Sequence, residues 1–188
     1  AMKAMFFFDD QIIVISDKIQ NGDGRHPVGT TLYQSHLPGT DTPTWVQGRK
    51  ITRLNGMKRF ASGQAVSLVD PVGNGYYIPD AKGLIVRRAR QHSLDDTATK
   101  TTEGNFAAAW FDHGVLPEQA NCEFVILVGS GPEGLSRLAR KAKKTYSVLQ
   151  RSSREIIVAH HSLGLTGYVL PRADTEIPKG MIARVSAP

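Results

Sequence analysis

Short apolar runs, in which apolar and polar residues alternate, dominate the sequence, and turn residues separate one run from the next. This period of two is typical of strands, because successive side chains of a strand point to opposite faces. The predicted strands are Lys3–Phe8, Gln11–Ser16, Thr30–Ser35, Lys50–Leu54, Ala65–Val69, Gly75–Ile78, Leu84–Ala89, Asn105–His113, Cys122–Val128, Tyr146–Gln150, Glu155–His160, Leu165–Leu170 and Met181–Val185. Many short strands joined by turns predict an all-β fold, an antiparallel β-sandwich.

One segment departs from this pattern and predicts a short helix over residues 132–144. Pro132 suits the first helical position, where its missing amide hydrogen costs no hydrogen bond. An apolar stripe follows with helical spacing: Leu135, Leu138, Ala139 and Ala142. Cations crowd the second half, where they favour the helix dipole: Arg140, Lys141, Lys143 and Lys144. Residues 92–104 are polar instead, and are predicted to form a long exposed loop.

The chain of 188 residues is long enough for one sizeable core, so residues 3–188 are expected to form a single β-sandwich domain. Residues 1–2 resemble a remnant of expression, and no secretion signal is visible after them. The end at Ala187-Pro188, directly after a predicted strand, indicates a domain cut from a longer chain. No apolar run reaches the length of a transmembrane helix, so no membrane partner is expected.

The single cysteine and the net charge further limit the possible functions of the chain. Cys122 is the single cysteine, so no internal disulfide can form, and its place in an apolar strand predicts a buried, inert thiol. The net charge of +6 suits a polyanion such as nucleic acid, anionic lipid or an acidic polysaccharide. The alternative is that these cations only solvate the surface.

A basic cluster ends one predicted strand at Arg87, Arg88 and Arg90. With Arg25, His26 and Lys82 it could bind carboxylates or sulfates, because a guanidinium pairs with two oxygens at once. Arg87 and Arg88 are adjacent and should point to opposite faces, so only part of the cluster can form one patch. The competing interpretation is a charged strand edge that discourages pairing with other chains.

The segment Trp110–Gly114 combines aromatic residues with an acid and a histidine. Trp110 and His113 could form a platform for a sugar, or the segment could be a core strand that runs into a turn.

Two other patterns favour ordinary structure. Gly129–Gly134 matches the glycine fingerprint of dinucleotide-binding folds, but Pro132 removes an amide from the turn that would hold the phosphates. We therefore interpret it as a strand-to-helix turn. Adjacent residues His160 and His161 should face opposite sides of a strand, and no paired ligand motif occurs, so neither a metal site nor a cofactor is predicted.

Several segments, in order, resemble the β-domain of the polysaccharide lyase family that includes hyaluronate lyase and chondroitin ABC lyase. The first has an aromatic strand at Met5–Phe8, then Asp9-Asp10, a second strand at Ile12–Val14, a polar loop, and Gly29–Leu32. This sequence has Gly29 where an acid is common in the family. It also has Ile15-Ser16-Asp17-Lys18-Ile19 in place of Leu-Gly-Ser-x-Ile.

Two further blocks carry the same resemblance. Gly73–Pro79, followed by Arg87–Thr97, is similar to the family's Gly-Tyr-Tyr strand and its basic strand and loop. Ala109–Gly114, followed by Cys122–Leu127, is similar to its Trp-x-x-His-Gly strand and the next strand.

The resemblance implies a bacterial, secreted or periplasmic enzyme that cleaves hyaluronan or chondroitin sulfate by β-elimination. In the family the catalytic residues lie in an α/α-toroid domain, and no residue of this chain matches them. The chain is therefore expected to be a non-catalytic domain that is part of a supersandwich, braces the missing toroid and walls the substrate cleft. Its expected sugar-contacting residues are Arg25, His26, Arg87, Arg88, Arg90, Trp110 and His113. No nucleic acid partner is expected.

Two alternatives from other classes remain open at this point. One is a stand-alone carbohydrate-binding module for acidic polysaccharides, and the other is a nucleotide-binding domain built on Gly129–Gly134.

Overall fold

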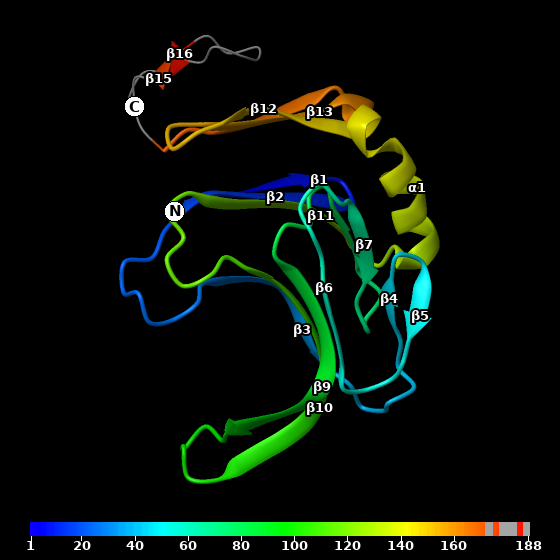
Figure 1. Ribbon diagram of the computed structural model, residues 1–188. Coiled ribbons are helices and arrows are strands. Elements are labelled where there is room, and N and C mark those ends of the chain that lie inside the picture. Colours follow the sequence, from blue (N-terminus) through cyan, green and yellow to red (C-terminus); the bar gives the residue numbers. More distant parts are fainter. Residues whose placement is uncertain (172–174, 177–183, 186–188) are drawn as a thin grey trace.

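Three antiparallel sheets are stacked in layers, with one α-helix beside them (Figure 1). The computed structural model describes residues 1–171, 175–176 and 184–185. Every strand pair in this part of the chain is antiparallel. The prediction of an all-β sandwich with a single helix is confirmed, and the helix spans Gly131–Thr145 rather than 132–144.

The central layer is a seven-stranded sheet in the order β1-β2-β11-β8-β7-β4-β5. Its strands are β1 (Met2–Phe8), β2 (Gln11–Ile19), β4 (Thr44–Val46), β5 (Arg49–Ile51), β7 (Val66–Val69), β8 (Gly75–Ile78) and β11 (Ala120–Leu127). The hairpin between β1 and β2 turns at Asp9-Asp10, as predicted, and Asp9 takes a positive φ of 53°. An aspartate tolerates this left-handed conformation better than most residues.

The second layer is a four-stranded sheet in the order β3-β10-β9-β6. Its strands are β3 (Gly29–His36), β6 (Gly56–Arg59), β9 (Leu84–Leu94) and β10 (Thr101–Asp112). The long β9–β10 hairpin bends, and its concave side is turned away from the seven-stranded sheet (Figure 1).

The third layer covers the opposite face of the seven-stranded sheet. It contains β12 (Tyr146–Arg151), β13 (Ile156–His160) and β14 (Leu165–Val169), with a 3-10 turn at His161–Leu163. The helix α1 leads into it from β11 and packs against β7 and β8. A separate pair joins β15 (Thr175–Glu176) to β16 (Arg184–Val185).

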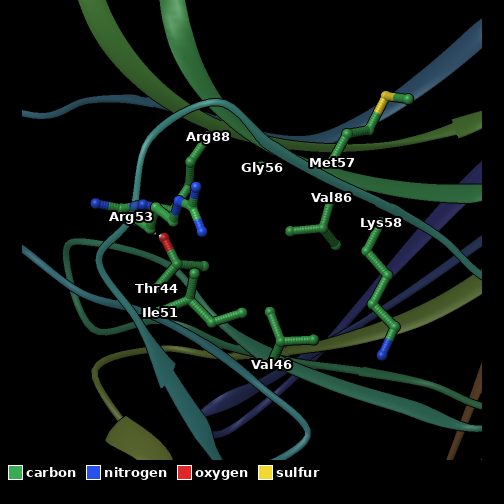
Figure 2. A pocket seen from close by; sticks show the side chains of 9 residues that line it. All are labelled: Thr44, Val46, Ile51, Arg53, Gly56, Met57, Lys58, Val86 and Arg88. Carbon is green, nitrogen blue, oxygen red and sulfur yellow. Dashed lines mark hydrogen bonds between the residues drawn. The ribbon is translucent and has the colours of Figure 1, made fainter.

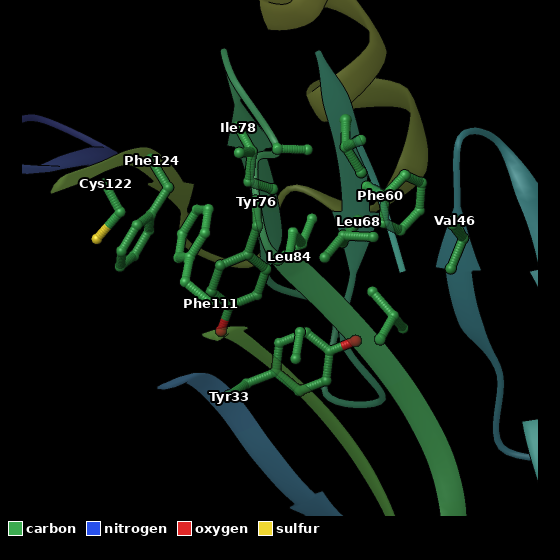
Figure 3. Packing of buried hydrophobic residues seen from close by; sticks show 14 of the residues in the cluster. Tyr33, Val46, Phe60, Leu68, Tyr76, Ile78, Leu84, Phe111, Cys122 and Phe124 are labelled. Carbon is green, nitrogen blue, oxygen red and sulfur yellow. The ribbon is translucent and has the colours of Figure 1, made fainter. Parts of the chain in front are cut away.

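Two hydrophobic cores lie on either side of the seven-stranded sheet. The core toward the four-stranded sheet includes Tyr33, Leu68, Tyr76, Phe111 and Phe124 (Figure 3). The core toward the third layer contains side chains of β1, α1 and β13. This explains the uninterrupted apolar run in β2: Val14 enters the first core, whereas Ile13 and Ile15 enter the second.

Two predictions about strands were wrong. Residues 92–104 are not one long loop, because β9 continues to Leu94 and β10 begins at Thr101, leaving only a short connection. This part of the hairpin extends beyond the cores, so its side chains carry no apolar alternation. The strands β4 and β6 were not predicted: β4 has only three residues, and β6 is exposed along its whole length, so it carries no apolar alternation. Of the predicted strand Met181–Val185, residues 181–183 lie outside the described residues, as do the final residues 186–188.

The glycine segment before α1 is a strand-to-helix turn, as predicted. Gly129 and Gly131 adopt positive φ values of 60° and 59°. β11 is antiparallel to both of its neighbours, β2 and β8. A dinucleotide fingerprint needs a parallel strand–helix–strand unit, so this turn does not support nucleotide binding.

Candidate functional site

The concave face of the four-stranded sheet carries a groove of about 530 Å³, which we call the polar groove. Its lining residues come from β3, β9 and β10: Thr31, Gln34, Arg87, Arg90, Gln91, His92, Ala108 and Trp110. Three of these, Arg87, Arg90 and Trp110, were predicted from the sequence to contact sugar. The structure brings them to one groove.

Strand register explains how the centre of the polar groove is built. Ala108 of β10 lies between Gln34 of β3 and Arg87 of β9. Trp110 is two residues further along β10 and therefore shares a face with Ala108. The inward-facing neighbours Ala107 and Ala109 are fully buried in the core, which fixes the opposite direction for Ala108 and Trp110.

This arrangement suits a sugar that carries a carboxylate or sulfate. The small side chain of Ala108 forms a floor between two longer polar side chains. Trp110 offers an aromatic face beside that floor, and Arg87 offers a guanidinium that can bind two oxygens. Gln34 donates a hydrogen bond from its amide to Gln91 at 2.9 Å, and amides of this kind can also bind hydroxyl groups.

The far end of the polar groove is less positive than the sequence suggests. Arg90 forms an ion pair with Glu103, and Nδ1 of His92 lies 3.5 Å from the same carboxylate. The charge of Arg90 is therefore already balanced within the protein. Arg87 has no ion pair among the described residues, which makes it the better candidate for binding an anion.

Arg88 does not line the polar groove. Its side chain enters the molecule, where Nη1 donates to Oγ1 of Thr44 at 2.8 Å. Its other amino group donates to three backbone carbonyls, those of Thr40, Thr42 and Thr52. Only 2% of the residue is exposed, and burial lowers the pKa of its guanidinium. The predicted sugar contact at Arg88 is thus replaced by a role in tying a loop to β9.

A second pocket, of about 170 Å³, opens beside Arg88 at the end of the sandwich. Figure 2 shows Arg53, Thr44 and Arg88 on one side of it and Lys58 on another. Its remaining walls are mostly aliphatic, and the Thr44 hydroxyl is occupied by Arg88. The pocket therefore offers few free hydrogen-bonding groups for the hydroxyls of a sugar.

The other predicted contacts lie away from the polar groove. Arg25 and His26 belong to an exposed loop in which Asp23 accepts their backbone amides, chiefly that of Arg25, which lowers the pKa of Asp23 to about 2. His113 is half-buried: Nε2 lies 2.9 Å from Oγ1 of Thr30, and burial lowers its pKa. These interactions hold loops and strand ends in place.

Five lining residues of the polar groove were not predicted as site residues: Thr31, Gln34, Gln91, His92 and Ala108. All lie within strands, but nothing in the sequence indicates that β3 pairs with β10 or in which register. In the part of the chain that the structure describes, no group of three His, Cys, Asp or Glu residues is placed to hold a metal ion. The described helices include none that is long and apolar enough to span a bilayer.

Three stacked antiparallel sheets around two cores define the chain as a super-sandwich domain. A family model described as polysaccharide lyase family 8, super-sandwich domain, matches residues 1–139. The chain therefore belongs to polysaccharide lyase family 8.

Characterised relatives agree with this assignment. Chondroitin sulfate ABC endolyase of Proteus vulgaris is 31% identical over 171 residues, covering 89% of this chain and 17% of that protein. Chondroitinase-AC of Pedobacter heparinus is 31% identical over 173 residues, covering 88% of this chain and 23% of that protein. The solved structure of a Paenibacillus xanthan lyase has the same fold, with a TM-score of 0.75 and 23% identity over 89% of this chain and 17% of that one. The chain spans less than a quarter of the length of each.

Proposed function

We propose that this chain is the β-sandwich part of a bacterial lyase and that its polar groove contacts an acidic polysaccharide, with chondroitin sulfate or hyaluronan as the substrate. The observation that carries the proposal is the placement of Arg87 and Trp110 beside the Ala108 floor. The carboxylate of a uronate would pair with Arg87 while the sugar ring lies against Trp110. The relatives named for chondroitin sulfate support this class of substrate.

In such an enzyme a base removes the proton α to the uronate carboxylate. The bond to the glycosidic oxygen then breaks, an acid protonates the departing oxygen, and an unsaturated uronate remains. Among the lining residues of the polar groove, His92 alone has a side chain of a type that commonly serves as a general acid or base, and its ring lies against Glu103. We therefore assign this chain to binding and to bracing a catalytic toroid domain, in a protein that works outside the cytoplasm.

Two measurements on the chain alone test this proposal. Binding tests the polar groove, and product formation tests the non-catalytic assignment. Fluorescently labelled chondroitin sulfate and hyaluronan oligosaccharides are titrated with the chain and with Arg87→Gln. Arg154→Gln serves as the control, because it removes the same charge from the exposed turn between β12 and β13, away from the groove. We expect Arg87→Gln to weaken binding about ten- to hundredfold, in line with loss of a charge-assisted hydrogen bond of about 1.5–3 kcal/mol, and Arg154→Gln to change it little.

Ultraviolet absorbance of the unsaturated product is followed in the same samples. No product is expected from the chain alone at any concentration. Product formation in proportion to protein would contradict the non-catalytic assignment. Equal binding by the chain and by Arg87→Gln would contradict the assignment of the polar groove.

A stand-alone carbohydrate-binding module is the second candidate, and the unpaired cation in the groove also favours it. This alternative predicts that the isolated chain binds the polysaccharide as tightly as any longer protein that contains it. A supporting domain predicts that the toroid adds most of the affinity.

A further inference from the structure

The solvent-facing side of α1 carries five exposed cations, which we call the basic helix face: Arg137, Arg140, Lys141, Lys143 and Lys144. None of them forms an ion pair with a described residue. Arg140 donates to Oγ of Ser136 at 2.8 Å, and Glu133 in the first turn is the one acidic residue of the helix. The positive charge of this surface is therefore almost uncompensated.

Helix stability does not account for this density of charge. Lys143 and Lys144 lie in the last turn, where they favour the helix dipole. Arg137, Arg140 and Lys141 lie earlier, where the dipole gives them little benefit. Cations three or four residues apart, such as Arg137 with Lys141 and Arg140 with Lys144, repel each other and destabilise the helix. An external anion would relieve this repulsion.

The helix α1 and the concave side of the four-stranded sheet lie on opposite sides of the molecule (Figure 1), and the polar groove is on that concave side. Leu135 and Leu138 fix the helix on the outer side of the seven-stranded sheet, as part of the core toward the third layer. The four-stranded sheet with the polar groove covers the other side of the same sheet. A ligand on the helix therefore does not occupy the polar groove.

Shallow grooves run along both flanks of α1. One, of about 340 Å³, is lined by Arg140 and Trp45 together with the hydroxyl-bearing Ser67 and Ser136. The other, of about 530 Å³, is bordered by Arg137 and Lys141, and also by Asp10 of the β1–β2 turn, so it is the less positive of the two. Along the helix axis, Arg137 and Lys144 are separated by about 10 Å at 1.5 Å per residue, which is comparable to the length of a disaccharide unit.

We propose that the basic helix face is a second binding surface for an anionic polysaccharide, separate from the polar groove. The choice of polysaccharide rests on the proposed function, whereas the presence of a polyanion surface rests on the helix alone. The aromatic face of Trp45 and its polar neighbours suit a sugar next to the cations. A polymer held there would remain near the enzyme between turnovers, because a tethered chain has a high effective concentration at the other site.

The two tryptophans of the chain make the two surfaces separately observable. Trp110→Phe leaves Trp45 as the sole reporter beside the helix, and Trp45→Phe leaves Trp110 as the sole reporter in the polar groove. Both are titrated with chondroitin sulfate oligosaccharides at low and at moderate salt. We expect saturable fluorescence changes from both, with separate affinities.

In the Trp110→Phe background, the combined substitution Arg137→Gln, Arg140→Gln and Lys141→Gln is compared with Lys3→Gln, Lys18→Gln and Arg154→Gln. The control removes the same charge from exposed positions that line neither the polar groove nor the grooves beside the helix. We expect the helix variant to lose at least tenfold in affinity at Trp45 and to depend less on salt, while the control keeps most of its affinity. The urea midpoint of the helix variant should equal or exceed that of the parent, which excludes misfolding.

Unchanged affinity of the helix variant at Trp45 would overturn the proposal. So would a loss of affinity for a single-stranded oligonucleotide or for anionic vesicles without a loss for chondroitin sulfate, because the helix would then serve another polyanion. Failure of the proposed function has a different signature. In that case Arg87→Gln leaves the Trp110 signal unchanged, whatever the helix variant does.

Discussion

Arg87 and Arg88 are adjacent in β9, yet their side chains lie on opposite faces of the four-stranded sheet. Arg87 is exposed in the polar groove, whereas Arg88 is 2% exposed and donates to one hydroxyl and three backbone carbonyls. Strand geometry alone produces this division. One arginine is thus available to an external anion, and the other supports the loop between β3 and β4 and the chain after β5.

Replacing Arg88 should therefore affect stability rather than binding. Arg88→Met would leave the buried hydroxyl of Thr44 and the partly buried carbonyls of Thr40, Thr42 and Thr52 without their donor, at a cost of about 2–4 kcal/mol in the free energy of unfolding. Arg87→Gln should change it by less than about 0.5 kcal/mol, because the side chain is exposed. Urea unfolding measures both, and a difference below about 1 kcal/mol between the variants would contradict this account of Arg88.

The floor of the polar groove gives a second prediction, which tests shape rather than charge. Ala108→Leu would place a larger side chain between Gln34 and Arg87 while leaving the charge of the groove intact. We expect weaker binding of chondroitin sulfate oligosaccharides, by about tenfold, with the salt dependence retained. Ala61→Leu, at an exposed position outside this sheet, is the matched control. Equal binding by both variants would mean that the sugar does not enter the groove.

Sequence periodicity was sufficient for most strands and the helix but not for the layers or the site. The stripe of α1 indicates which face of the helix is buried, and strand alternation places Arg87 and Arg88 in opposite directions, so both could be predicted. The pairing of strands that are far apart in the sequence leaves no periodic pattern in either strand. Gln34 meets Ala108 only through the β3–β10 register, and that register contains an irregularity between Ala109 and Trp110.

The sequence shows how many cations the chain carries, but not which of them are free to bind an external anion. Glu103 balances Arg90, and backbone carbonyls hold Arg88, whereas the sequence presents these two residues and Arg87 as one cluster. The cations of α1 were attributed to the helix dipole, which explains only those in the last turn.

Tyr33 and Tyr76 pack together in the first core, with ring centroids 5.2 Å apart. We expect this pair to make the folded state less stable at alkaline pH. Burial, followed by the charge of Asp70, raises the pKa of both phenols above the ordinary value. The folded state therefore holds these protons more tightly than the unfolded state. The stabilisation is complete below the unfolded pKa of about 10 and is lost as pH rises above it. Urea midpoints across this range should fall as tyrosinate absorbance appears.

The two tyrosines should differ when they are replaced. The Tyr33 hydroxyl is buried and has no hydrogen-bond partner among the described residues, so Tyr33→Phe should keep or raise stability at neutral pH and reduce the alkaline loss. The Tyr76 hydroxyl donates to Asp70 at 3.0 Å, so Tyr76→Phe should cost about 1–3 kcal/mol. Equal effects at neutral pH would contradict the assigned hydrogen bonding.

His160 predicts the corresponding sensitivity to acid. It is 2% exposed, its ring centroid lies 5.1 Å from that of Phe8, and burial lowers its pKa. The unfolded state therefore takes up the proton more readily than the folded state. The stabilisation is complete above the unfolded pKa of about 6.5 and is lost as pH falls below it toward the folded pKa. Stability should therefore decline between about pH 8 and about pH 5, the range in which histidine titrates.

His160→Phe keeps an aromatic ring in the second core but cannot take up a proton, so it should flatten this decline. His161→Gln is the comparison variant: His161 is the exposed neighbour, its Nε2 lies 3.0 Å from Oγ of Ser147, and its charge lowers the pKa of His160 less than burial does. A smaller decline should persist in His160→Phe, since burial also lowers the pKa of His113. Urea midpoints at both ends of the range measure the effect. An unchanged decline in His160→Phe would assign the acid sensitivity to other groups, because protonation of a buried imidazole must otherwise favour the unfolded chain.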